Sequence, residues 1–394
     1  MIRIIFLFLL ITFYSCSKKN DAFPELYVGF LKSNDSINIP FNFNLNDSLM
    51  FITNSNEKIN LSISNDNDSI KAQSPFFEDF LMFVILKDSI SGFYYNKSLQ
   101  RKIPFFAKPG KNRFLFKKMY SDFDGKWKVV FNYNTTSSFN SEMIISQSKN
   151  DISGTVRTET GDYGFMEGVV SDNKMSMSNF NGYRGYMIEG YLKGDTIKGN
   201  LYRGNYDVKN FIAYKDESFK LPDPYGLTKM KNGIEKFNFS FKNEFGELIS
   251  SSDNKFIGKI NLIQIMGSWC PNCLDESRFL LELSKKYNNI NVTAIAFEFA
   301  NSEEKAINNI KKLKNSLGID YDILLAQYNS SNKIDAAQKL SSLDTLISYP
   351  TLIVVDKKQK VRRIHTGFNG PATGENYDLF KKEFEDFLQK LILE

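Results

Sequence analysis

Two cysteines, Cys270 and Cys273, lie between an apolar run and a segment suited to a helix, and this arrangement constrains the fold most strongly. Residues 260–266 have the composition of a buried strand, and a Gly-Ser pair follows them. Pro271 favours a helix start, because the first helical turn does not need the N–H that proline lacks. We therefore expect a helix over residues 271–287, with Cys270 at its N-terminus and Cys273 one turn inside.

This placement predicts thiol chemistry. A cysteine attacks a disulfide only as its thiolate, and a free cysteine with a pKa of about 8.5 is mostly protonated at neutral pH. A helix N-terminus lowers that pKa, because its unpaired N–H groups and the helix dipole stabilise negative charge. We expect Cys270 to be the attacking thiolate and the more buried Cys273 to resolve the mixed disulfide. Trp269 is expected to be an apolar lid that limits the access of water.

The cysteine count narrows the alternatives. The chain has three cysteines and one histidine. A zinc site that used the Cys270–Cys273 pair would need two further Cys or His ligands, and a structural disulfide framework would need more cysteines. We therefore expect a redox-active disulfide between Cys270 and Cys273, with no organic cofactor and no metal.

The N-terminus is typical of an export signal. Arg3 precedes an apolar run over residues 4–14, which is too short to span a bilayer but suits a signal peptide. The run ends just before Cys16, in a stretch that resembles a bacterial lipoprotein box. The resemblance implies a signal peptide over residues 1–15, a lipid on Cys16 that anchors the chain to a membrane, and a tether over residues 16–24. A plain signal peptide cut further along is the alternative.

The rest of the chain divides into parts with different hydrophobic patterns and turn signals. Its length of 394 residues suggests two or three domains. Short alternating runs with frequent turn signals predict two β-rich modules, barrels or sandwiches, over residues 25–118 and 119–217. A linker over residues 218–232 then leads to an α/β domain over residues 233–394. The net charge of +5 is small and the charges alternate, so we expect no nucleic-acid partner.

Within residues 233–394, strands alternate with helices, which indicates a sheet covered by helices. We expect the second helix to be capped by Asn301 and to end at Gly318.

Residues 237–394 resemble the thioredoxin superfamily, and specifically the TlpA/ResA-like periplasmic reductases. The resemblance rests on the motif at residues 267–273, on residues 348–353 and on the hairpin turn at residues 356–361. It implies a cis peptide bond before Pro350 in a loop that faces the cysteines. The backbone of Tyr349 could then pair with an incoming extended peptide. A trans-proline turn is the alternative.

Four further residues bear on the match to this group or on the chemistry of the site. Glu276 matches a glutamate that raises thiol pKa values or relays a proton in the ResA-like group, although it could simply be an acid that favours the helix dipole. Gln264 stands where thioredoxin has a buried aspartate, which puts the proton route in doubt. Arg278 replaces a proline. His365 is expected to be structural, with catalysis as the alternative.

The whole chain resembles multidomain TlpA-like lipoproteins of the Bacteroidetes kind. The resemblance implies a periplasm-facing envelope thiol:disulfide oxidoreductase that reduces disulfides of partner proteins, apocytochrome c among them, with electrons from a membrane thiol donor. Oxidation is the open alternative, because potentials in this fold range from about −270 to −120 mV. A second alternative is a binding lipoprotein in which the β-rich half carries the main function. An aromatic row there either lines a ligand cup or packs a core; its members are Tyr183, Tyr186, Tyr191, Tyr202 and Tyr206.

Overall fold

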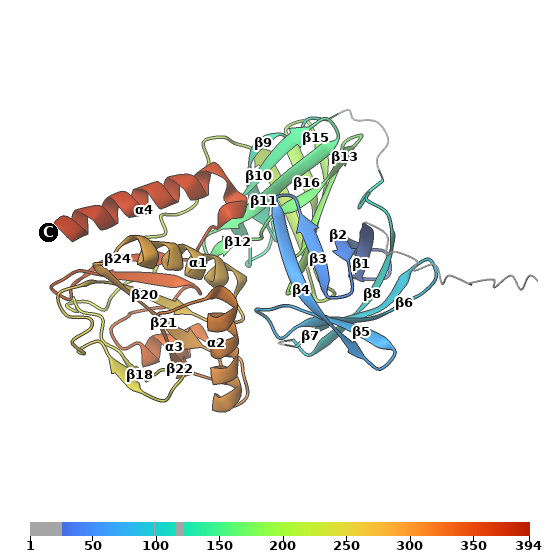
Figure 1. The fold of residues 1–394 in the computed structure, drawn as a ribbon. Coiled ribbons are helices and arrows are strands. Elements are labelled where there is room, and N and C mark those ends of the chain that lie inside the picture. Colours follow the sequence, from blue (N-terminus) through green and yellow to red (C-terminus); the bar gives the residue numbers. More distant parts are fainter. Residues whose placement is uncertain (1–25, 98, 116–120) are drawn as a thin grey trace, which may run out of the picture.

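The structure, a computed structural model, describes residues 26–97, 99–115 and 121–394 (Figure 1). The predicted signal peptide, the lipidated Cys16 and the tether lie outside the described residues. Within these ranges, no helix combines the length and the apolar character needed to cross a membrane.

The first β module is a closed barrel, because its first strand pairs with both the second and the last. Alternate residues of its strands point inward, and aromatic rings such as Phe41, Phe43 and Phe105 fill the interior. The strands are β1 (Tyr27–Lys32), β2 (Asn38–Leu45), β3 (Leu49–Asn54), β4 (Glu57–Asp66), β5 (Ser69–Gln73), β6 (Phe80–Ile85), β7 (Ile90–Asn96) and β8 (Arg101–Pro109).

The second β module is also a sheet that closes on itself. Residues 139–148, the strand at one end of the sheet order, pair with residues 125–131 and also with residues 151–158 near the other end. Trp127 lies in its core, where its indole Nε1 donates to the carbonyl of Phe123 at 2.9 Å. The strands are β9 (Gly125–Phe131), β10 (Phe139–Ser148), β11 (Asp151–Thr158), β12 (Gly161–Asp162), β13 (Met166–Ser171), β14 (Lys174–Phe180), β15 (Gly185–Lys193), β16 (Thr196–Arg203) and β17 (Asp207–Lys215).

The third part, the redox domain, is an α/β sheet in the order β19-β18-β22-β21-β20-β23-β24, so the predicted fold class is confirmed. All of β20 (Ile260–Met266) is buried, which explains its mainly apolar composition. The strands are β18 (Ser240–Lys242), β19 (Leu248–Ser250), β20 (Ile260–Met266), β21 (Ile290–Phe297), β22 (Asp322–Gln327), β23 (Thr351–Val355) and β24 (Val361–Thr366). The helices are α1 (Pro271–Lys286), α2 (Glu303–Leu317), α3 (Lys333–Lys339), η1 (Pro371–Thr373) and α4 (Glu375–Leu393).

The predicted cap of α2 is wrong by one residue. Ser302, not Asn301, is the N-cap, and its hydroxyl accepts from the N–H of Lys305 at 3.3 Å. Serine and asparagine cap helices about equally well, so the local sequence does not decide between neighbours. The other end is as expected, since Gly318 has the left-handed φ of 66° that terminates the helix.

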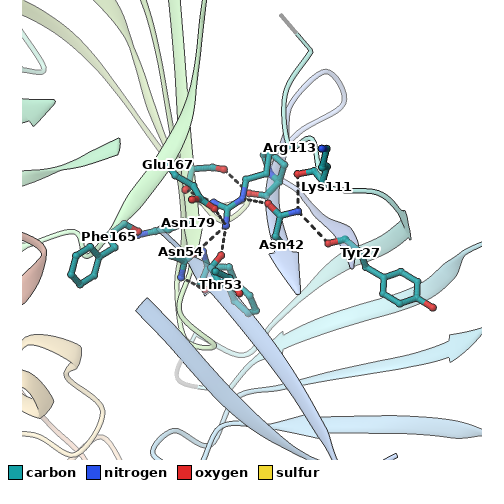
Figure 2. Close-up of polar contacts among 12 residues, drawn as sticks. Tyr27, Asn42, Thr53, Asn54, Lys111, Arg113, Phe165, Glu167 and Asn179 are labelled. Carbon is teal, nitrogen blue, oxygen red and sulfur yellow. Dashed lines mark hydrogen bonds and ion pairs between the residues drawn. The ribbon is translucent and has the colours of Figure 1, made fainter. Parts of the chain in front are cut away.

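Arg113, which follows β8, joins the two β modules (Figure 2). Its Nε donates to Oδ1 of Asn42 in the first module at 2.7 Å. On the second module, Nη1 donates to the carbonyl of Ser178 at 2.8 Å and Nη2 forms an ion pair with Glu167 at 2.7 Å. This buried guanidinium therefore ties two separately closed sheets into one unit.

Both β modules also pack against the redox domain. Phe77 and Tyr183, one from each module, stack at 4.7 Å and belong to the apolar core cluster of the redox domain. From α2, Nζ of Lys312 donates to the carbonyls of Ser74 at 2.9 Å and Phe77 at 2.7 Å. The loop between β5 and β6 is thereby held beside the redox domain.

Candidate active site

The two cysteines form a disulfide at the start of α1. Cys270 is the N-cap, and its Sγ accepts from the N–H of Cys273 at 3.2 Å. Pro271 occupies the first helical turn, as the sequence predicts. Cys270 is 6% exposed and Cys273 is fully buried, so Cys270 is the sulfur that an incoming group meets first.

The loop before β23 faces this disulfide. The peptide bond between Tyr349 and Pro350 is cis, and the Tyr349 carbonyl oxygen lies 3.6 Å from Sγ of Cys270. The hydroxyl of Thr351 donates to the carbonyl of Ser348 at 2.8 Å, which fixes the loop. The structure therefore brings Tyr349 and Pro350 to the side of Cys270.

Trp269 covers the other side of the motif. Its ring lies 4.4 Å from that of Phe299 and 5.7 Å from that of Tyr349, and its Nε1 donates to the carbonyl of Phe297 at 2.9 Å. These contacts hold the indole as a fixed apolar wall beside Cys270.

Glu298 is a site residue that the sequence reasoning missed. Its carboxylate accepts from the N–H of Ser268 at 2.8 Å and from the hydroxyl of Ser268 at 2.6 Å, and it thereby holds the turn before the cysteines. Burial raises the pKa of Glu298 to about 7, although the bonds from Ser268 oppose this rise. The sequence did carry a signal for Glu298, which directly follows β21. Because β21 runs parallel to β20, the residues after both strands lie at the same edge of the sheet as the cysteines.

Glu276 is fully buried on α1, and neither of its oxygens has a hydrogen-bond partner among the described residues. Burial raises its pKa to about 8, and the neighbouring Gln264 offsets only part of the rise. Gln264 itself donates to the carbonyl of Cys273 at 3.1 Å and accepts from the hydroxyl of Ser277 at 2.9 Å. Glu276 does not lie in the first turn, so the helix-dipole explanation does not fit it.

Residues 159–162 of the second β module form a covering loop over the motif, which the sequence did not predict. The side-chain amide of Asn272 pairs with the backbone of Asp162, and its nitrogen donates to the carbonyl oxygen of Asp162 at 3.3 Å. The amide oxygen lies 3.2 Å from the N–H nitrogen of Asp162. Oδ2 of Asp162 accepts from the N–H of Gly370 at 2.5 Å, and the hydroxyl of Ser348 donates to the carbonyl of Thr160 at 3.3 Å. The covering loop thus closes one side of the redox site.

A cavity of about 540 Å³ opens beside Cys270, a volume typical of small-ligand sites. All three parts of the chain line it. Trp269 and Tyr349 come from the redox domain, Phe76 from the first β module, and Tyr163 and Tyr186 from the second.

Three carboxyl groups from the three parts meet at one wall of this cavity. Burial, followed by the charge of Asp275, raises the pKa of Glu57 to about 7 and that of Asp162 to about 6. Burial also raises the pKa of Asp275, which accepts from Nη1 of Arg278 at 2.7 Å.

Other candidate residues are placed elsewhere. His365 packs between the rings of Tyr225 and Phe380 and does not line the cavity, and burial lowers its pKa to about 4. In the aromatic row, Tyr186 lines the cavity, Tyr183 packs against Phe77, and Tyr191 is exposed. Across the described ranges, no cluster of His, Cys, Asp and Glu is arranged to hold a metal ion.

Comparisons with known proteins place the similarity in the last part of the chain. Residues 232–379 match the Redoxin family. The thioredoxin-like protein YneN of Bacillus subtilis is 26% identical over 139 residues, which cover 35% of this chain and 73% of YneN. The thiol-disulfide oxidoreductase ResA of Bacillus cereus is 28% identical over 163 residues, which cover 41% of this chain and 80% of ResA. A solved thiol-disulfide oxidoreductase from Bacteroides fragilis aligns at 21% identity with a TM-score of 0.28, covering 37% of this chain and 98% of that one.

Proposed function

We propose that this chain, which carries a TlpA/ResA-like thiol:disulfide oxidoreductase domain of the thioredoxin superfamily, reduces disulfide bonds of partner proteins in the bacterial cell envelope. The observation that carries the proposal is the placement of Cys270. It caps α1, forms a disulfide with Cys273, and lies 3.6 Å from the Tyr349 carbonyl beside Pro350. A substrate sulfur held along this loop would be in line with the attacking sulfur.

The exchange takes place in two steps. The Cys270 thiolate attacks a substrate disulfide, forms a mixed disulfide and releases one substrate thiolate. The Cys273 thiolate then attacks Sγ of Cys270, forms the intramolecular disulfide and releases the second thiolate. Two electrons and two protons pass to the substrate. A dithiol donor at the membrane returns the pair to the reduced state by the same exchange in reverse.

Glu276 is proposed to accept the proton that Cys273 must lose. The carboxyl is buried one turn after Cys273, has no hydrogen-bond partner among the described residues, and has a pKa of about 8. A group with a pKa near neutrality gains and loses a proton readily at physiological pH. Gln264 cannot take this role, because a neutral amide does not titrate and both of its ends are bonded.

The location is part of the proposal. The apolar run before Cys16 supports export and a lipid anchor, which would hold the redox domain at a membrane facing the periplasm. Apocytochrome c is one partner that such a location allows. Mass spectrometry of the mature protein tests the anchor. An acylated Cys16 as the first residue supports it, and any other first residue contradicts it.

The β modules are proposed to act with the redox site and not as an independent binding protein. They contribute the covering loop and much of the cavity wall beside Cys270.

Reduction of insulin disulfides tests the proposal. Purified wild type should accelerate the reaction in the presence of a dithiol, and Cys270→Ser should abolish the acceleration. Lys108→Gln, an exposed change on β8, is the matched control and should behave as wild type. Equal activity of wild type and Cys270→Ser would contradict the enzyme assignment. A reduction potential above about −150 mV would contradict the reducing direction.

A further inference from the structure

The cavity beside Cys270 has a cationic wall made by the second β module. Arg184, Arg203 and Lys209 all line it. Arg184 lies 4.9 Å over the ring of Tyr183, and within the described ranges no carboxylate is within ion-pair distance of it. A guanidinium in a partly buried setting without a counter-ion is costly, and a bound anion removes that cost.

The other two cations share one carboxylate. Lys209 forms an ion pair with Asp207 at 2.9 Å, whereas Nε of Arg203 is 3.9 Å from the same group. That nitrogen is buried and has no hydrogen-bond partner among the described residues. Among the described residues, Asp207 is therefore the one acid that pairs with any of these three cations, and Nε of Arg203 is a donor without a partner.

Two of the acids that line the cavity are already engaged. Asp162 accepts from the N–H groups of Gly370 and Gly164, at 2.5 and 2.7 Å. Asp275 is paired with Arg278. Two more acids line the cavity, Glu57, whose pKa burial raises to about 7, and Glu159, and two more cations line it, Arg278 and Lys333. Five cations therefore face four acids, so the lining as a whole carries positive charge.

The same wall offers a flat apolar surface. The rings of Tyr163 and Tyr186 stack at 4.9 Å, and the guanidinium of Arg203 lies 5.8 Å over Tyr186. A small ligand could lie against these rings with its anionic end toward the arginines and its sulfur toward Cys270, because all of these residues line one cavity.

We propose that this cavity binds the substrate disulfide and that Arg184 and Arg203 select disulfides flanked by carboxylate groups. The inference rests on the proposed function, since it names the substrate class of the same site. The chemistry is the exchange described above: one substrate disulfide becomes two thiols while the Cys270–Cys273 pair becomes a disulfide.

The test uses full-length protein that has been reduced and freed of reductant. It is mixed with one of three small disulfides: dithiodiglycolate, which is dianionic, hydroxyethyl disulfide, which is neutral, or cystamine, which is dicationic. Alkylation of the remaining protein thiols gives the rate of oxidation. For each disulfide, the rate of a variant is divided by that of wild type, because this ratio cancels the intrinsic reactivity of the disulfide.

Arg184→Gln should lower the rate with dithiodiglycolate about tenfold, the effect of losing one charge-assisted hydrogen bond, and should affect the other two disulfides much less. Arg203→Gln should show the same pattern and serves as the second variant if Arg184→Gln fails to fold. Arg101→Gln is the matched control, since Arg101 lies 5.3 Å over the ring of Tyr206 but does not line the cavity. It should leave all three rates as in wild type.

Equal ratios for all three disulfides in both variants would overturn the selection by charge while leaving the exchange reaction intact. Failure of wild type to react with any of the three would instead contradict the proposed function. A second arm distinguishes the source of the carboxylates. Disulfide-linked peptides with Glu or Gln beside the cysteine are compared, and a faster reaction of the Glu peptide that requires Arg184 indicates a polypeptide segment. If the rate with dithiodiglycolate depends on Arg184 but the Glu and Gln peptides react equally fast, the substrate is a small-molecule disulfide.

Discussion

Asn272, which lies between the two redox cysteines, pairs its side-chain amide with the backbone of Asp162 in another part of the chain. The two contacts, at 3.3 and 3.2 Å, resemble one rung of a β ladder. Gly161 and Phe368 continue this contact as a parallel bridge. The motif that we propose carries out the exchange is therefore also a docking point for the second β module, which links access to Cys270 with domain packing.

Gly161 is predicted to be essential for this docking. Its φ is +142°, and a Cβ at this position would collide with the Asn272 amide. Gly161→Val should therefore displace the covering loop, lower the stability by about 1–3 kcal/mol and speed the alkylation of reduced Cys270. Thermal unfolding and alkylation rates measure the two effects.

Gly194→Asn is the control for this change, because Gly194 also has a positive φ, of 59°, but has open space around its Cβ position. It should alter neither quantity appreciably. An alkylation rate in Gly161→Val equal to that of wild type would show that the covering loop does not restrict Cys270.

Glu276 is predicted to make stability depend on pH. Burial raises its pKa in the folded protein from 4.5 to about 8, so between these values the folded state retains a proton that the unfolded state has lost. Its contribution to stability is therefore greatest at low pH and is lost as the pH rises from about 4.5 to about 8. Urea unfolding of the oxidised protein should show that Glu276→Gln weakens this decline.

The exposed Glu282 on the same helix supplies the control, and Glu282→Gln should leave the decline unchanged. A Glu276→Gln variant with the same pH dependence as wild type would contradict the buried, protonated state assigned to this carboxyl.

Arg113 is predicted to hold the two β modules together. Arg113→Met would leave the carbonyl of Ser178, Oδ1 of Asn42 and the Glu167 carboxylate without this donor. The expected loss of stability is about 2–4 kcal/mol, measured by urea unfolding. Lys108→Met, an exposed cation on β8, should cost far less. Comparable losses in the two variants would show that the Arg113 network contributes little.

The elements around the cysteines could be predicted because their signals are local. The apolar run predicts β20, and Pro271 predicts the start of α1. The structure places β20 at residues 260–266 and α1 at residues 271–286. The alternating residues and frequent turn signals of the first half likewise predicted strands. They did not decide between a barrel and a sandwich, because strand closure depends on pairing between distant strands. Where two neighbouring residues cap equally well, as with Asn301 and Ser302, local sequence is not decisive.

The parts that could not be predicted depend on contacts between distant residues. Asp162 meets Asn272 more than a hundred positions away, and no pattern within either segment announces the partner. Glu298 similarly reaches Ser268 because β20 and β21 pair, and Arg184 lines the cavity because the second β module packs beside Cys270. Charge and residue type suggest what such groups can do, but only the packing shows which of them share a site.

The most direct test of the central claim, that Cys270 attacks and Cys273 resolves, is trapping of the mixed disulfide. Reduced Cys273→Ser is incubated with hydroxyethyl disulfide, and the adduct is located by mass spectrometry of its peptides. The account predicts rapid, stoichiometric modification of Cys270 in Cys273→Ser and only slow modification of Cys273 in Cys270→Ser. Equal rates of adduct formation at the two cysteines, or a faster rate at Cys273, would contradict it.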